Sequence, residues 1–168
     1  MLQLQRHFAD AGISDKSNAF FDEFQIGAGD TRNLSENSSE NLNIISAFII
    51  SINRSNGISE AEDIANLAIE YHKKFPDVVV GLELSGNPAL GKFEDFISIF
   101  TKARNAGLKI SLHCGEISNP EEIIQMLQFK PDRIGHGTCI HPNYGGTDET
   151  WEALCTSKIP VGMFRKCD

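Results

Sequence analysis

The chain has 168 residues, a formal net charge of −8 and four cysteines. This length suits one domain of about 100 to 200 residues, and the acidic balance argues against a nucleic-acid partner, since such partners bind to basic surfaces. The cysteines show no CxxC spacing, which favours reduced thiols in a cytosolic setting over a disulfide framework. No run approaches the roughly 18 apolar residues of a membrane span, so we expect no membrane partner.

The N-terminal quarter of the chain carries few structural signals. Glycines break its apolar pattern near residue 28, and residues 33–43 are a polar tract that indicates an exposed loop. We therefore predict a poorly specified N-terminal segment over residues 1–43 and a folded domain over residues 44–168.

Five short apolar runs in that domain predict strands. They are residues 44–52, 78–84, 108–112, 133–134 and 159–161. The first two are almost continuously apolar, as expected of strands that are buried on both faces of a parallel sheet.

Each pair of neighbouring strands is separated by a stretch with helical periodicity. We expect the first helix to be capped at Ser59, the third at Asn119 with Pro120 in its first turn, and the last at Thr147. Alternation of strand and helix is typical of an α/β fold with parallel strands and right-handed crossovers. Because a complete (β/α) barrel takes about 250 residues, the pattern predicts a partial TIM-type barrel, roughly the second half of the eight-fold repeat.

Two of the predicted strands run into histidines. His113 and Glu116 follow the third strand, and His136 follows the fourth. A single histidine at a strand end is usually a hydrogen-bonded structural residue. Because the carboxyl ends of parallel strands meet at one edge of a sheet, where ligands gather, the three together predict a functional site.

The segments around these residues resemble the adenosine and AMP deaminase family. His113-Cys-Gly-Glu116 resembles the family's His-Ala-Gly-Glu, residues 133–137 resemble its Arg-Ile/Leu-Gly-His-Gly, and residues 81–88 resemble a strand-end segment that ends in Gly-Asp. The order and spacing also agree, and the resemblance covers about residues 41–160. The adenosine deaminase-like branch, which acts on N6-methyl-AMP, is the most similar.

The resemblance implies a zinc-dependent aminohydrolase that removes the C6 amine of a purine nucleotide or nucleoside to give IMP or inosine. It implies that His113 is a ligand of Zn²⁺, that Glu116 donates and shuttles a proton, and that His136 orients the attacking water. It also implies that the backbone at Gly86 contacts the purine base. Asn53 stands where the branch has aspartate, and we expect it to bind substrate too.

Other parts of the family pattern have no counterpart in this sequence. The family's zinc site includes a His-x-His and an Asp-Asp pair, and neither occurs in the matching places. We therefore expect a fragment or alternative product of a deaminase whose own activity is doubtful. One alternative is an inactive partial barrel that self-associates through open sheet edges. Another is a metal-dependent amidohydrolase of the same (β/α) architecture.

Three further residues are interpreted as structural rather than catalytic. His72 stands beside two lysines on a helix and is expected to be a solvated surface residue. His141 lies in a loop, and Cys114 is expected to pack in the core rather than act as a nucleophile.

Overall fold

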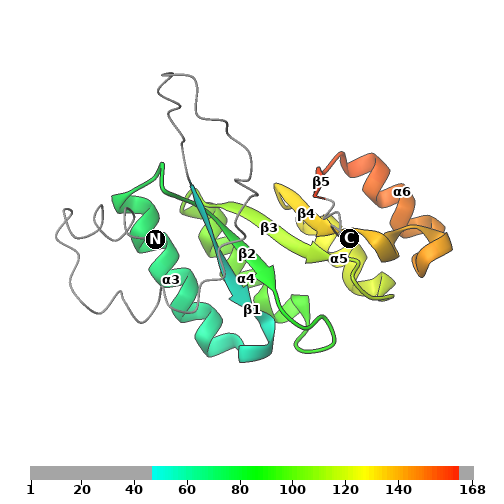
Figure 1. The fold of residues 1–168 in the computed structure, drawn as a ribbon, viewed down its shortest axis with the longest axis horizontal. Coiled ribbons are helices and arrows are strands. Elements are labelled where there is room, and N and C mark those ends of the chain that lie inside the picture. The colour runs from blue at the N-terminus through cyan, green and yellow to red at the C-terminus, as the bar shows by residue number, and fades with distance from the viewer. Residues whose placement is uncertain (1–46, 163–168) are drawn as a thin grey trace, which may run out of the picture. The chain divides into compact units, whose positions relative to one another are not determined.

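The computed structural model describes residues 47–162, and its five strands form one parallel sheet in chain order. The strands are β1 (Phe48–Asn53), β2 (Val79–Ser85), β3 (Lys109–Cys114), β4 (Arg133–His136) and β5 (Val161–Gly162). The longer helices are α3 (Ile58–Lys74), α4 (Phe93–Asn105), α5 (Pro120–Phe129) and α6 (Asp148–Ser157). Figure 1 shows the strands and helices succeeding one another along the chain. The predicted α/β fold with parallel strands is confirmed, whereas the prediction for residues 1–43 lies outside the described residues.

Three single turns of 3-10 helix complete the described part of the chain. They are η2 (Arg54–Asn56), η3 (Thr138–Ile140) and η4 (Pro142–Tyr144). The last two flank His141, which was expected to lie in a loop. Among residues 47–162, no helix is both long and apolar enough to span a bilayer.

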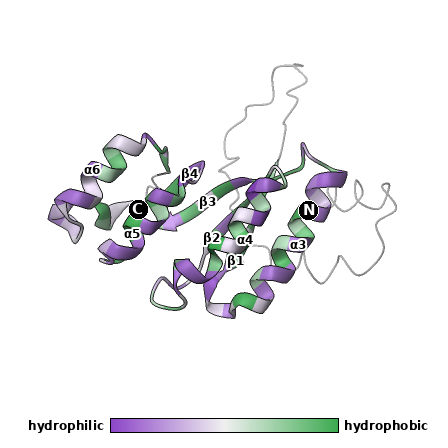
Figure 2. Ribbon diagram, turned by 180° about the vertical axis from the view of Figure 1, so that it is seen from behind, coloured by the Kyte–Doolittle hydropathy of each residue, from purple (hydrophilic) through white to green (hydrophobic). Residues whose placement is uncertain are grey.

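One face of the sheet is apolar and forms the core with the helices. Its residues are Ile50, Ile52, Leu82, Leu84, Ile110, Leu112, Cys114 and Ile134, each at most 8% exposed. Helix α3 packs against β1 and β2, and α4 and α5 pack against β3. Apolar and polar residues both occur along these helices in Figure 2, as expected of helices with one side in a core. Burial of this sheet face against the helices therefore holds the strands in register.

The opposite face of the sheet is polar, so the prediction of strands buried on both faces was wrong. Ser51, Glu83, Ser111 and Arg133 occupy paired positions on four successive strands and form one row across the sheet. Ser51 and Glu83 are half-buried and Arg133 is exposed. Side chains alternate between the faces of a strand, so the polar residues scattered among the apolar ones collect on the side away from the helices.

The ends of the helices show which of the capping predictions hold. The side chain of Asn119 accepts a hydrogen bond from the backbone of Glu122, and Thr147 forms a capping box with Thr150, so both predicted caps are confirmed. The cap predicted at Ser59 was wrong. Helix α3 begins at Ile58, and Gly57, with φ of 88°, precedes it without a side-chain cap.

Candidate active site

The three residues expected at the site lie together at the carboxyl ends of β3 and β4. His136 Nε2 is 2.8 Å from Glu116 Oε1, and His113 Nδ1 is 3.7 Å from the same oxygen. The two imidazoles are 3.3 Å apart between His136 Nε2 and His113 Nδ1. All three side chains are half-buried. The cluster is therefore only partly shielded from water.

The direction of His136 depends on an unusual backbone conformation. Strict alternation along β4 would place it on the apolar face with Ile134, two residues before it. His136 instead has φ of 66°, in the left-handed region that non-glycine residues seldom adopt. This conformation turns the imidazole toward His113 and Glu116. Strained backbone of this kind is characteristic of functional sites.

The direction of Glu116 depends on the glycine before it. Gly115 has φ of 71°, and a Cβ at this position would lie 2.9 Å from Ile140 Cγ1. A glycine is therefore needed both for the turn and for the close approach to the chain after β4. The turn brings the Glu116 carboxylate back over the strand end to His113.

A second carboxylate, which we did not predict as a site residue, lies on the other side of His113. Glu83 Oε1 is 3.6 Å from His113 Nε2. The hydroxyl of Ser111 donates a 2.8 Å hydrogen bond to the same oxygen, and Arg133 Nη2 lies 3.7 Å from it. Arg133 Nε also donates to the Ser111 hydroxyl at 3.1 Å. The signal that could have revealed Glu83 is a charged residue within an otherwise apolar strand.

The charges of the site shift two protonation equilibria. The contact with Glu83 raises the pKa of His113 above its ordinary value, outweighing burial, which acts in the opposite direction. Burial alone would raise the pKa of Glu83, but its contacts with His113 and Ser111 outweigh that effect, so the pKa is lowered. The site therefore favours a negative Glu83 beside a readily protonated His113.

The two expected substrate-binding residues lie at the ends of the neighbouring strands β1 and β2. Asn53 pairs with Ser85 in the sheet, and its side-chain oxygen accepts a hydrogen bond from the backbone of Ser55. Gly86 has φ of 94°, and a Cβ on it would come within 2.1 Å of Asn53 Oδ1. The two residues are thus in direct contact, at the same edge of the sheet as His113 and His136.

Three residues interpreted as structural have partners in the core or loops. Cys114 is 2% exposed, and burial raises the pKa of its thiol to about 12, so its packing role is confirmed. The ring of His141 lies 4.8 Å from that of Trp151. The expectation for His72 was wrong, because it is half-buried and its Nδ1 lies 2.7 Å from the carbonyl oxygen of Val79.

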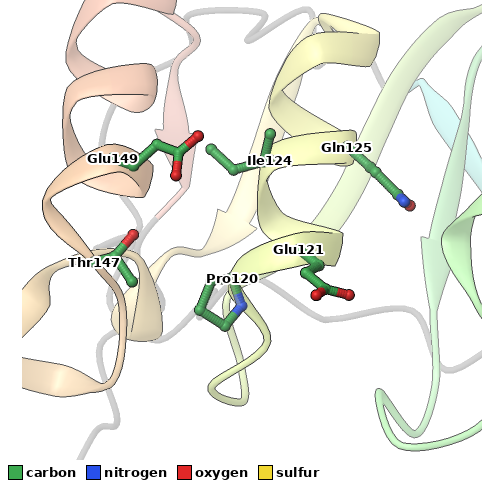
Figure 3. Close-up of a pocket in the computed structure, with 6 residues that line it drawn as sticks. All are labelled: Pro120, Glu121, Ile124, Gln125, Thr147 and Glu149. Carbon is green, nitrogen blue, oxygen red and sulfur yellow. The ribbon is translucent and has the colours of Figure 1, made fainter.

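A separate hollow of about 380 Å³ lies between α5 and α6. Figure 3 shows its lining residues, which are Pro120, Glu121, Ile124, Gln125, Thr147 and Glu149. None of the residues of the strand-end cluster lines it. The hollow is therefore distinct from the candidate active site.

The strand-end cluster contains a set of groups that could hold a metal ion. One ligand atom each from His113, Glu116 and His136 lies within 4.8 Å of the others. Neutral imidazole and carboxylate are ordinary ligands of zinc, and two histidines with one glutamate is a donor set found in catalytic zinc sites.

Comparison with known proteins places this arrangement in a family. The family model for adenosine deaminase matches residues 29–159. The adenosine deaminase-like protein of Drosophila pseudoobscura pseudoobscura is 44% identical over 71% of this chain and 33% of its own length. The N6-methyl-AMP deaminase of Homo sapiens is 35% identical over 77% of this chain and 37% of its own length.

Solved structures agree with the sequence matches. An Arabidopsis N6-mAMP deaminase gives a TM-score of 0.61 at 38% identity, and the match covers 70% of this chain and 32% of that structure. An Arabidopsis relative solved in complex with GMP gives the same TM-score at 39% identity, with the same coverage. The chain thus spans about a third of the length of these relatives, as expected of a partial barrel. The chain belongs to the adenosine deaminase family.

Proposed function

We propose that this chain carries part of the active site of a zinc-dependent purine aminohydrolase, which replaces the C6 amine of N6-methyl-AMP or a related purine with oxygen. The observation that carries the proposal is the convergence of His113, Glu116 and His136 at one edge of a parallel sheet. Homologues named N6-methyl-AMP deaminase support the reaction class. The products would be IMP, or inosine from a nucleoside, and the amine.

The residues present fit a zinc ion. The cluster offers two imidazole nitrogens and one carboxylate oxygen, which are donors that zinc accepts. Of these three residues, we assign His113 as a ligand of the zinc ion. When bound, zinc lowers the pKa of a coordinated water and thereby supplies a nucleophile at neutral pH.

The remaining residues of the cluster supply proton transfer and orientation. Glu116, held 2.8 Å from His136, is placed to donate a proton to a ring nitrogen of the purine and to carry another to the leaving amine. His136 is placed to accept a hydrogen bond from the attacking water and orient it. The half-buried position of both side chains limits competition from bulk water.

Purine recognition is assigned to the neighbouring strand ends. The backbone of Gly86 and the amide of Asn53 lie in direct contact there and present hydrogen-bonding groups. The relatives solved with GMP and IMP support a nucleotide rather than a free base as the ligand.

The test is conversion of N6-methyl-AMP to IMP by the zinc-loaded chain, measured by chromatography. Catalysis by this chain alone predicts turnover that Glu116→Gln abolishes and that His141→Ala, a change outside the cluster, leaves intact. No turnover by the original chain under conditions where a full-length relative is active would overturn catalysis by this chain. An increase in melting temperature with IMP, but not with an amide substrate, would exclude the amidohydrolase alternative.

A second candidate function rests on the edges of the sheet. Among the described residues, the sheet has β1 and β5 at its two edges, and edge strands can pair with another chain. The alternative is an inactive module that self-associates through these edges.

We also propose a cytosolic setting, which the free thiols of Cys114, Cys139 and Cys155 support.

A further inference from the structure

We propose that Arg54 is a positioning residue for the purine nucleotide, because its guanidinium fixes the segment of residues 86–92 that follows β2. The inference rests on the purine recognition proposed above for Gly86 and Asn53, and it concerns how that contact is kept in place. Arg54 is only 4% exposed, so we assign it no direct contact with the ligand. It acts through the backbone of the segment.

The guanidinium binds two successive carbonyl groups near the far end of the segment. Arg54 Nε donates to the carbonyl oxygen of Leu90 at 2.9 Å, and Nη2 donates to that of Gly91 at 2.7 Å. The Leu90 side chain is 49% exposed, so the segment directs its carbonyls to Arg54 and this side chain to solvent. The backbone of Leu90 also donates to the carbonyl oxygen of Asn87 at 3.0 Å. One planar group with a rigid spacing of donors therefore fixes the path of the segment.

Both ends of the segment pack against the strand end that carries Arg54. A Cβ on Gly86 would lie 2.1 Å from Asn53 Oδ1 and 3.3 Å from the backbone nitrogen of Arg54. A Cβ on Gly91 would lie 3.3 Å from the carbonyl oxygen of Arg54. The segment thus leaves and returns to one place at the end of β1. Loosening its far end would therefore free the backbone at Gly86 to move as well.

Glu122 connects this arrangement to the proton-transfer side of the candidate site. Its carboxylate pairs with Arg54 Nη2 at 2.5 Å and accepts a 2.8 Å hydrogen bond from the backbone of Phe93, the first residue of α4. Glu122 lies in the first turn of α5, the helix that follows Glu116. A buried ion pair is weak evidence for stability, since apolar residues in the same space often stabilise a fold as well. The fixed geometry that the pair gives to the two sides of the site accounts for it better.

The experiment replaces Arg54 with lysine, which keeps a positive charge beside Glu122. A lysine ammonium is a point charge and does not reproduce the rigid fork that binds two carbonyls at once. The matched control is Arg104→Lys. Arg104 also donates to two carbonyl oxygens, those of Phe129 and Lys130, at 3.0 and 2.9 Å, but these residues precede β4, at the opposite edge of the sheet.

Two readouts are taken on the full 168-residue chain. Calorimetry measures the affinity for IMP, and hydrogen–deuterium exchange read by mass spectrometry follows the backbone amides of residues 86–92 without ligand. Urea denaturation followed by circular dichroism gives the stability of each variant. A merely structural role predicts that IMP affinity falls only as far as the folded fraction does. Glu122→Gln, which keeps an acceptor for the guanidinium, is a milder second variant.

We expect Arg54→Lys to remain folded and to exchange the amides of the segment faster than the original chain. It should bind IMP about 10- to 100-fold more weakly, since small displacements of binding groups have effects of this size. Glu122→Gln should show both changes to a smaller extent, and Arg104→Lys should show neither.

Two outcomes separate this inference from the proposed function. Unchanged IMP affinity or unchanged amide exchange in Arg54→Lys would overturn the inference and leave the proposed function intact. No IMP binding by the original chain would overturn the purine recognition itself, and the inference with it.

Discussion

The guanidinium of Arg54 forms a buried ion pair with the carboxylate of Glu122, with Nη2 and Oε1 2.5 Å apart. The pair joins the end of β1 to the first turn of α5. Arg54 also donates to the carbonyl oxygens of Leu90 and Gly91, and Glu122 accepts a hydrogen bond from the backbone of Phe93. These contacts hold in place the segment between β2 and α4. The first residue of that segment is Gly86, which is proposed above to take part in purine recognition.

Removal of Arg54 should therefore destabilise the fold. We expect Arg54→Ala to lower the free energy of unfolding by about 3 to 5 kcal/mol, because it leaves a buried carboxylate without its partner. Urea denaturation followed by circular dichroism measures the change. The control is Lys74→Ala, which breaks a 2.6 Å ion pair with Glu70 whose side chains are more than half exposed. That variant should unfold almost like the original chain, and an equal loss in both variants would contradict the assignment.

The contact between Gly86 and Asn53 predicts coupled substitutions. Gly86→Ala places a Cβ on Asn53 Oδ1 and forces alanine into positive φ, a strain of about 1 to 3 kcal/mol before the clash is counted. In an Asn53→Ala background the clash is relieved and only the strain remains. Melting temperatures of the two single variants and the double variant measure the coupling. Purely additive effects would show that the two side chains do not meet.

Burial of Cys114 predicts selective thiol chemistry. Burial, with a smaller contribution from Glu122, raises the pKa of the Cys114 thiol to about 12, so its thiolate is scarce near neutral pH. Cys155 is exposed. Alkylation of the folded chain, read by mass spectrometry, should modify Cys155 before Cys114. Equal rates at the two positions would contradict the packing role of Cys114.

Asp132 predicts a loss of stability in acid. Burial alone would raise the pKa of Asp132, but the hydrogen bond from the backbone of Ile110 and the contact with Lys109 outweigh it, so the pKa is lowered. A lowered pKa in the folded state stabilises the fold above the ordinary aspartate value of about 3.9, and this contribution disappears as the pH falls through the folded pKa.

Asp132→Asn tests this contribution. The variant should be less stable than the original chain near neutral pH, and the difference should shrink below about pH 4. Denaturation curves at a series of pH values measure it. Because the Asp132 side chain is partly exposed, the effect should be small. A difference that stays constant with pH would show that the charge of Asp132 is not the cause.

The edge strands of the sheet formed by residues 47–162, which are β1 and β5, predict self-association. If the edges pair between chains, light scattering after size-exclusion chromatography should show a mass that rises with concentration. Val161, which is 39% exposed on β5, offers a test, because Val161→Lys places a charge on that edge and should shift the distribution toward monomer. A concentration-independent monomer with cooperative unfolding would exclude the association module.

Sequence periodicity was sufficient to predict the order of the strands and helices. It was also sufficient to predict the edge of the sheet at which the candidate site lies. Helix signals at Asn119 and Thr147 act within a few residues, so they could be read without knowledge of the fold. Parallel strands bring their carboxyl ends together, which is why His113 and His136 could be expected at one edge. The cap at Ser59 was wrong, because the chain enters α3 through Gly57 in a conformation that no capping pattern indicates.

By itself, therefore, the sequence determined the alternation of strands and helices and the set of residues at their carboxyl ends. Only the tertiary structure decided which atoms meet. Alternation of side chains along β4 would have placed the His136 imidazole on the apolar face of the sheet. The left-handed backbone at His136 turns the imidazole to the opposite face. Glu83 reaches His113 because the sheet register pairs Glu83 with Ser111. Such contacts join residues far apart in the chain, and their geometry depends on strand register and backbone torsion, which local composition does not encode.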